Sequence, residues 1–167
     1  QVGVELQEKG KVGYHQQGEG SLSTRMEVHS EDFDFHEAMS KVEFWQGDAC
    51  NLKAHFTGYD LIMATNLIDR LYEPRLFLDS IHERINAGGY LILTSPYTWL
   101  EEYTQKEHWV GGYTDENGKE VTTLDGLKEI LAKQFELVAT EDVPFVIRET
   151  PRKYQHTLSQ MSVWKKR

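Results

Sequence analysis

The chain has 167 residues, of which 39% are apolar, and its formal net charge at neutral pH is −9. This length suits one domain, and the apolar fraction is large enough to form a buried core. The acidic balance argues against nucleic-acid binding, which needs a face of clustered Lys and Arg. We therefore expect no nucleic-acid partner.

The cysteine content and the hydropathy bear on the compartment. Cys50 is the single cysteine, so an internal disulfide is excluded and a reducing compartment is favoured. No apolar run approaches the roughly 20 residues that a membrane-spanning helix needs, and residues 1–11 lack a signal-peptide pattern. The sequence predicts a cytoplasmic protein with no membrane partner. Its seven histidines show no close ligand spacing, so we expect no metal site.

Residues 1–40 are expected to form the tail of a helix and an inserted hairpin. Residues 1–9 have helical composition, and the glycine that follows suits a helix C-terminus. Residues 11–17 and 21–28 flank a glycine-rich turn, which indicates a strand–loop–strand unit. Residues 31–40 are polar, with weak helical periodicity.

Residues 41–167 alternate short apolar runs with amphipathic stretches, a pattern typical of an α/β protein with a parallel sheet. The last two strands are separated by a short polar connection and should form an antiparallel pair at one edge. In chain order we expect strands over 42–46 and 59–65, a helix over 73–86 and a strand over 90–94. A short helix over 98–108 and a helix over 122–133 follow. The chain then forms an interrupted strand over 135–140 and 144–149 and a final strand over 154–164.

Polar residues follow two of these expected strands. Asp48 comes after the strand over 42–46, and Asn66 comes after the strand over 59–65. In open α/β sheets, ligands bind outside the carboxyl ends of the strands. We therefore expect Asp48 and Asn66 to face one crevice.

Several longer motifs resemble one group of enzymes, the class I S-adenosylmethionine (SAM)-dependent methyltransferases. Within that group they resemble the 4-mercaptohistidine N1-methyltransferase of ovothiol biosynthesis, which commonly forms the C-terminal domain of 5-histidylcysteine sulfoxide synthase. The motifs are GDACN at 47–51, NLIDRL at 66–71, TSPYTWLEE at 94–102, TLDGL at 123–127, PFVIRET at 144–150 and RKYQ at 152–155.

The resemblance implies a Rossmann-like methyltransferase sheet that ends in an antiparallel strand pair. It also implies SAM as the cofactor and an amino acid as the small-molecule substrate. The family's first two strands, with the glycine-rich loop that carries the methionine half of the cofactor, find no counterpart in residues 1–167. We therefore expect one N-terminally incomplete methyltransferase domain. Its sheet would be completed by an upstream domain or by a second copy in a homodimer.

The resemblance assigns the adenine side of the cofactor site to Asp48 and Ala49, as acceptor and backbone donor, with Cys50 as a wall of the pocket. Asn66 and Leu67 would line the border between cofactor and acceptor. For Asp48 the alternative is a residue that starts a turn, and for Asn66 it is a strand-end cap. Cys50 has no histidine beside it in sequence, which argues against a nucleophile.

The acceptor pocket is expected to involve Tyr97 and Trp99, although a buried structural tryptophan is the alternative for Trp99. An α-carboxylate would suit a bidentate arginine, with Arg148 as the first candidate. Arg152 and Tyr154 complete the expected substrate-binding set; the alternative is a basic cluster that balances an acidic protein.

The implied reaction transfers a methyl group from SAM to an imidazole nitrogen of 4-mercaptohistidine. A neutral imidazole already has a lone pair, so alignment should supply most of the catalysis. Asn66, Asp69 and Tyr97 are the candidate catalytic residues. Asp69, Glu101 or Tyr97 would hold the other ring nitrogen as a weak base, or Asp69 would simply pair with Arg70. Two alternatives remain open: a class I methyltransferase for another small molecule, and a non-catalytic structural or dimerisation module.

Overall fold

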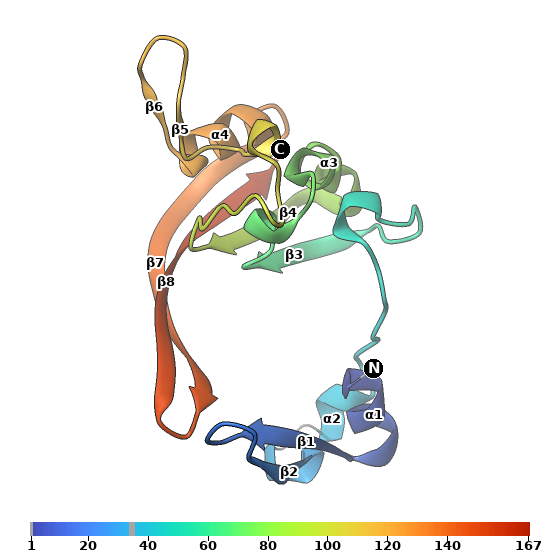
Figure 1. Cartoon of the computed structure of the whole chain (residues 1–167). Coiled ribbons are helices and arrows are strands. Elements are labelled where there is room, and N and C mark those ends of the chain that lie inside the picture. Colours follow the sequence, from blue (N-terminus) through green and yellow to red (C-terminus); the bar gives the residue numbers. More distant parts are fainter. Residues whose placement is uncertain (1, 34–35) are drawn as a thin grey trace. The chain divides into compact units, whose positions relative to one another are not determined.

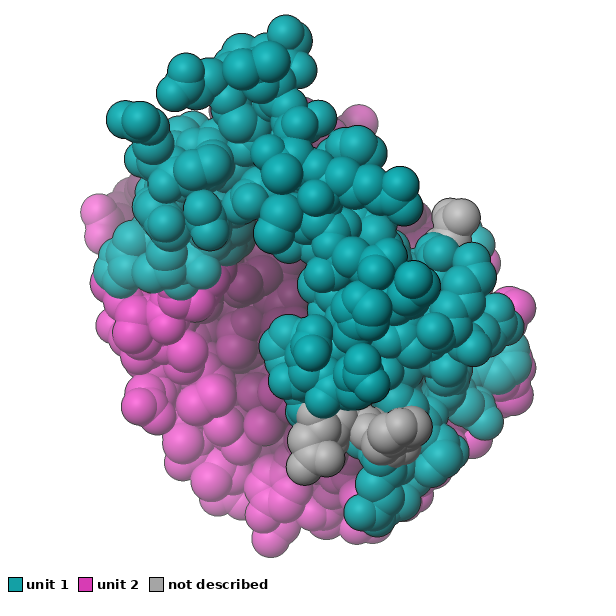
Figure 2. All heavy atoms as spheres, turned by 90° about the horizontal axis from the view of Figure 1, so that it is seen from below, with its two compact units in different colours: residues 1–46, 146–156 teal, residues 47–145, 157–167 magenta. Residues whose placement is uncertain are grey.

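The computed structural model describes residues 2–33 and 36–167 (Figure 1). The chain divides into two units, coloured separately in Figure 2. Unit 1 comprises Gln1–Gln46 and Val146–His156, and unit 2 comprises Gly47–Phe145 and Thr157–Arg167. We describe each unit by itself.

Unit 1 begins with a helix and a β-hairpin, as the sequence predicts. Helix α1 spans Val2–Lys9 and ends at Gly10, whose φ is 69° and whose N–H donates to Leu6 O at 2.9 Å. This geometry is that of a glycine C-cap. Strands β1 (Lys11–Gln17) and β2 (Ser23–His29) then pair antiparallel. The short helices η1 (Ser30–Phe33) and α2 (His36–Met39) follow, and residues 34–35 of the expected weak helix lie outside the described residues.

Unit 2 is built on a mixed sheet with the strand order β3-β4-β8-β7. Strand β3 (Tyr59–Thr65) runs parallel to β4 (Ile85–Ser95), and β8 (Lys153–Lys166) runs antiparallel to β4. Strand β7 (Phe135–Thr150) lies next to β8 at the other edge of the sheet. The predicted parallel middle strands and the terminal strand pair are both confirmed.

Strand β7 differs from the sequence prediction because it runs without interruption through Pro144. Proline has no N–H to donate, which usually excludes it from the interior of a sheet. Strand β7 is an edge strand, so one side of its backbone needs no strand partner. The edge position therefore explains why the proline does not break the strand.

The predicted strand over residues 42–46 is absent, which is a correction to the sequence analysis. The structure gives this segment no regular secondary structure, and Phe44 and Trp45 are 45% and 63% exposed. A strand forms only where a neighbouring strand pairs with its backbone groups. Strand β3 is the last strand on its side of the described sheet, and no described strand pairs with residues 42–46.

The two larger helices of unit 2 pack on one face of its sheet. Helix α3 spans Pro74–Ser80, and a 3-10 turn, η4 (Ile81–Arg84), follows it. The helix is shorter than the predicted 73–86 because β4 already begins at Ile85. Helix α4 (Thr123–Leu131) begins with a reciprocal capping box between Thr122 and Asp125, as the threonine pair predicted.

The segment over 98–108 is mainly a loop, in contrast to the predicted helix. Its described helical content is η5 (Lys106–His108), a 3-10 turn. A two-stranded hairpin, β5 (Tyr113–Thr114) and β6 (Glu120–Val121), follows. Gly126 then lets α4 approach the preceding loop, because a Cβ at this position would lie 1.7 Å from Val110 O.

The core lies between the sheet and its helices. The buried set includes Ala64, Phe77, Leu78, Ile81, Leu91, Leu93, Leu127, Leu131, Phe135 and Trp164. Side chains alternate across a strand, so Leu61, Met63 and Tyr90 point to the opposite face. These three are 49%, 59% and 38% exposed. The sheet of unit 2 therefore has one packed face and one face that exposes apolar side chains.

Candidate functional site

Strands β3 and β4 end together at one edge of the sheet. They are parallel, and Thr65 lies beside Thr94 in the register. Asn66 follows β3 directly, and Tyr97 follows β4 after Pro96. The fold thus brings the two predicted residues to the edge at which α/β proteins bind ligands.

Asn66 and Tyr97 share an uncommon backbone conformation. Their φ angles are 50° and 54°, and among the described residues they are the only non-glycine residues with positive φ. Asparagine tolerates the left-handed region, whereas a bulky tyrosine adopts it only where its surroundings impose it. Such strained residues cluster at functional sites, so this observation marks the strand ends as the candidate site.

The side chain of Asn66 is fixed by residues from two strands. Its Oδ1 accepts hydrogen bonds from Ser159 Oγ at 2.7 Å and from Thr94 Oγ1 at 3.3 Å. Its backbone N–H donates to Thr94 O at 2.8 Å. Ser159 belongs to β8 and is 2% exposed. The site therefore spans residues that are 93 positions apart in the sequence.

Tyr97 also binds a residue of β8. Its hydroxyl donates to Gln160 Oε1 at 3.0 Å, and its backbone N–H donates to Ser95 Oγ at 3.0 Å. Burial, with smaller contributions from the negative charges of Asp142 and Asp69, raises the pKa of Tyr97 to about 12. The phenol is therefore protonated at neutral pH and acts there as a hydrogen-bond donor.

Sequence analysis did not identify Ser159 or Gln160. The apolar–polar alternation of residues 154–164 indicated a strand but not its neighbour. The register that sets Gln160 beside Ser95 comes from the antiparallel pairing of β8 with β4. Both residues lie in the middle of β8 (Lys153–Lys166), among alternating polar and apolar residues, so no local signal in the sequence distinguished them.

Asp69 is the most buried acidic residue of this region, at 1% exposure. Its carboxylate accepts hydrogen bonds from Ser95 Oγ at 3.0 Å, from Thr98 N at 3.2 Å and from Thr98 Oγ1 at 3.0 Å. Arg70 Nη1 adds a fourth contact at 2.9 Å. A carboxylate has about four lone-pair positions, so these donors occupy its capacity. The geometry gives Asp69 the role of holding the loop after β4.

Arg70 completes this network. Its guanidinium donates to Thr98 O and Thr98 Oγ1, both at 3.0 Å, and lies 4.9 Å from the centre of the Tyr103 ring. The expected ion pair between Arg70 and Asp69 is therefore present, and the carboxylate in this pair is buried. Removal of Arg70 would leave the buried carboxylate of Asp69 without its opposite charge, which is strongly destabilising.

The predicted adenine side is organised around Asp48. Its Oδ1 accepts the N–H of Cys50 at 2.9 Å and so caps the 3-10 turn η2 (Ala49–Asn51), while Oδ2 accepts the hydroxyl of Tyr72 at 3.1 Å. Asp48 thus belongs to a hydrogen-bond group separate from that of Asn66. The strand expected before it is not formed, so a helix cap takes the place of a strand end.

The neighbours of Asp48 have structural contacts. Cys50 is buried, and its Sγ lies 3.4 Å from Glu73 O. Ala49 and Leu67 are partly buried against the core. Local desolvation, followed by the hydrogen bond to Asp48, raises the pKa of Tyr72 to about 12. Tyr72 was not identified from the sequence; its hydroxyl is a donor to Asp48 at neutral pH.

Trp99 is 8% exposed and packs against helix α4 and its loop. Its Nε1 donates to Thr123 Oγ1 at 2.9 Å, and its ring stacks on Trp109 with 6.3 Å between the centroids. These contacts support the alternative of a buried structural tryptophan.

The three remaining predicted residues lie in unit 1. The Arg148 guanidinium lies 6.0 Å from the centre of the Tyr154 ring, and Arg152 Nε lies 3.8 Å from Glu19 Oε1. All three residues are exposed. Their role in substrate binding stays a prediction.

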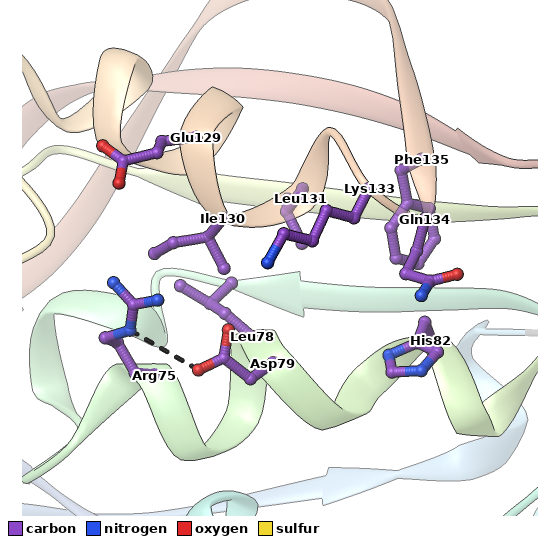
Figure 3. Close-up of a pocket in the computed structure, with 10 residues that line it drawn as sticks. All are labelled: Arg75, Leu78, Asp79, His82, Glu129, Ile130, Leu131, Lys133, Gln134 and Phe135. Carbon is purple, nitrogen blue, oxygen red and sulfur yellow. Dashed lines mark hydrogen bonds and ion pairs between the residues drawn. The ribbon is translucent and has the colours of Figure 1, made fainter.

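A separate cavity of about 300 Å³ lies between α3 and α4 (Figure 3). Its floor is apolar, with Leu78, Leu131 and Phe135, and an Arg75–Asp79 ion pair of 3.4 Å lies at its rim. None of the predicted site residues lines this cavity. The cavity is on the helix-covered side of the sheet and is distinct from the strand-end site.

Among residues 2–33 and 36–167, no group of three or more His, Cys, Asp or Glu side chains is arranged to hold a metal ion. No described helix is long and apolar enough to cross a bilayer.

Comparisons with known proteins give structural matches alone. No family model and no curated protein matches the chain. A structure solved for the conversion of a disulfide into a thioacetal in echinomycin biosynthesis matches with 12% identity and a TM-score of 0.48, covering 72% of this chain and 54% of that one.

Two further matches are named methyltransferases. A SAM-dependent methyltransferase from Methanosarcina mazei is 16% identical, with 83% of this chain and 79% of that chain covered and a TM-score of 0.49. The N-methyltransferase NodS from Bradyrhizobium japonicum, in complex with S-adenosylhomocysteine, is 12% identical, with 82% and 61% covered and a TM-score of 0.46. The solved structures to which this chain is similar thus include SAM-dependent methyltransferases, at a level that assigns no substrate.

Proposed function

We propose that this chain transfers a methyl group from SAM to an imidazole nitrogen of 4-mercaptohistidine. The observation that carries the proposal is the pair of left-handed residues, Asn66 and Tyr97, held at the ends of two parallel strands by β8. The sequence motifs that resemble the mercaptohistidine methyltransferase include both residues. The resemblance of the motifs supports the methyl-transfer reaction, and the conformation of the strand ends supports a ligand site at this edge.

Asp48 and Ala49, the residues that the resemblance assigns to adenine, have groups that suit the base. Asp48 is exposed, and its two donors, Cys50 N and the Tyr72 hydroxyl, leave part of its acceptor capacity for an amino group. Ala49 is the first residue of η2, so its N–H is one of the donors that a helix start leaves without an internal partner. An acceptor beside a donor suits the amino group and ring nitrogen of adenine.

The cofactor would supply the methyl group on a sulfonium, and the protein would align the acceptor with it. Tyr97 and Asn66 would border the acceptor and exclude water from one side. Asp69 would hold the loop that carries Tyr97, since its lone pairs are already occupied. A lone pair on neutral imidazole needs no strong base, so alignment carries most of the rate.

Single-turnover methylation tests the proposal. The chain, expressed with its natural flanking sequence, is mixed with SAM and 4-mercaptohistidine, and the product is followed by mass spectrometry beside a histidine control. We expect methylated mercaptohistidine and little methylated histidine. Methylation of other small molecules alone would favour the first alternative, a class I methyltransferase with a different acceptor.

One observation favours a second candidate, a structural or dimerisation module. Strand β3 is the sheet's edge, and the apolar side chains Leu61 and Met63 on it are half exposed. Such edges pair readily with another strand. Calorimetry with S-adenosylhomocysteine discriminates, because a module without enzymatic function has no affinity for it.

A further inference from the structure

The polarity of the Asn66 carboxamide follows from the groups around it. Thr94 Oγ1 accepts the backbone N–H of Asn66 at 3.2 Å, so its own proton is available to Asn66 Oδ1 at 3.3 Å. Ser159 Oγ lies 2.7 Å from the same oxygen. Two hydroxyl protons therefore converge on one side of the amide, which identifies that side as the oxygen.

The reversed amide would leave a buried proton without an acceptor. Ser159 is 2% exposed, and its bond to Asn66 is the one hydrogen bond that the described residues offer its side chain. Turning the amide nitrogen toward Ser159 would make the serine the acceptor and orphan its own O–H. A buried hydroxyl without its hydrogen bond is strongly disfavoured. The serine therefore fixes the amide in one orientation.

The amide nitrogen of Asn66 is then directed away from the two hydroxyls. Asn66 as a residue is exposed, and none of the described residues accepts a hydrogen bond from its Nδ2. The left-handed backbone keeps the side chain at the strand end. The amide nitrogen of Asn66 thus offers two N–H donors in a fixed orientation, and no described residue accepts a hydrogen bond from them.

We propose that Asn66 donates to a carboxylate of the bound ligand, and that Ser159 is the positioning residue that imposes this polarity from β8. The proposal rests on the proposed function, in which both ligands carry an amino-acid carboxylate. An ammonium group is excluded from this position because it has no lone pair to accept the bond. The carboxylate belongs either to the amino-acid tail of the cofactor or to the methyl acceptor.

Two pairs of probes distinguish these sources. S-adenosylhomocysteine is compared with methylthioadenosine, which lacks the amino-acid tail, and 4-mercaptohistidine is compared with its decarboxylated amine. Affinities are measured by calorimetry on the chain with its natural flanking sequence. Wild type should prefer the carboxylate-bearing member of one pair by about tenfold or more, the size of a hydrogen bond to a charged group. The pair that shows the preference identifies the source.

Four variants test the roles of the two residues. Asn66→Asp keeps the shape and the φ tolerance but replaces the donor by a negative acceptor, so it should abolish the preference. Ser159→Ala should reduce it severalfold, and Ser159→Thr, which restores the hydroxyl, should recover it. Ser162→Ala is the matched control, because Ser162 is on the same strand, is fully buried and binds Trp164 instead. It should leave the preference unchanged.

The inference is overturned if wild type shows no preference in either pair, or if Asn66→Asp retains it. It is also overturned if Ser159→Ala and Ser162→Ala behave alike. Should Ser159→Ala fail to fold, Asn66→Asp and Ser159→Thr still decide. A carboxylate preference without methylation of mercaptohistidine would defeat the proposed reaction and leave the inference standing, so the two failures are distinguishable.

Discussion

At the scale of single residues, the buried carboxylate of Asp69 organises the site. It accepts four hydrogen bonds, three of them from Ser95 and Thr98 in the segment that contains Tyr97. Replacing it by asparagine turns one acceptor into a donor that faces other donors. We expect Asp69→Asn to lower the free energy of unfolding by about 3 kcal/mol, measured by urea denaturation.

The control for this change is Asp79→Asn. Asp79 pairs with Arg75 on an exposed part of α3, with both side chains more than half exposed. Surface pairs of this kind contribute at most about 1 kcal/mol. An equal loss of stability in the two variants would show that burial of Asp69 does not organise the loop.

The raised pKa of Tyr97 gives a second prediction at this scale. Its ordinary value of about 10 in the unfolded chain is raised to about 12 by burial in the folded protein. The neutral phenol is thus favoured by folding. The stabilisation is complete below pH 10 and is lost as the pH rises through 12. Tyr97→Phe has no such titration, so its unfolding free energy should fall less between these pH values.

Chemical denaturation at several pH values, for wild type and for Tyr97→Phe, measures the effect. Parallel pH profiles for the two proteins would contradict the buried, hydrogen-bonded phenol. We also expect that the methyl-transfer rate does not rise between pH 8 and pH 10, because Tyr97 remains protonated in this range.

The residue types at the site were partly predictable. Asn66 could be found because it directly follows an apolar strand, and Tyr97 through the TSPYTWLEE motif that carries the family resemblance. Their positive φ values could not, since neither is glycine and neither lies in a turn signature. Ser159 and Gln160 could not be assigned either, because their role depends on a strand pairing that spans most of unit 2.

At the scale of elements, the two faces of β3 and β4 differ in their contribution to stability. Leu91 is fully buried in the core, whereas Leu61 on the neighbouring strand is 49% exposed. Leu91→Ala should therefore cost about 2–5 kcal/mol of unfolding free energy. Leu61→Ala removes a half-exposed side chain and should cost less than half as much. Comparable losses in urea denaturation would show that the outer face is packed in solution.

The start of α4 provides a further test at this scale. The Thr122 side chain accepts the N–H of Asp125, and the Asp125 carboxylate accepts the N–H of Thr122 in return. Thr122→Ala should cost about 1 kcal/mol of unfolding free energy. Thr114→Ala, at an exposed strand position of the neighbouring hairpin, is the control and should change stability by less than half of that. Equal effects would contradict the capping role.

The elements themselves were largely predictable where local chemistry decides them. The capping box, the glycine at the end of α1 and the apolar run of β3 depend on neighbours in sequence. Residues 42–46 have the composition of a strand but no described strand beside them, so they remain irregular. The continuous β7 was missed because Pro144 is tolerated only at the edge of a sheet, a position that the sequence did not reveal.

At the scale of the whole molecule, the strand order β3-β4-β8-β7 creates the candidate site. Two parallel strands bring Asn66 and Tyr97 to one edge, and the antiparallel β8 brings Ser159 and Gln160 to the same edge. The sequence predicted the parallel strands and the terminal pair. It did not predict that β8 lies between β4 and β7, which is the arrangement that lets β8 contact the site.

Methyl transfer at these strand ends can be measured directly in a single-turnover reaction. The chain with its natural flanking sequence is incubated in single-turnover conditions with SAM carrying an isotopically labelled methyl group and with 4-mercaptohistidine. We expect the label to appear on an imidazole nitrogen of mercaptohistidine and S-adenosylhomocysteine to be released in equal amount. Recovery of unlabelled mercaptohistidine, with SAM unconsumed, would contradict the account.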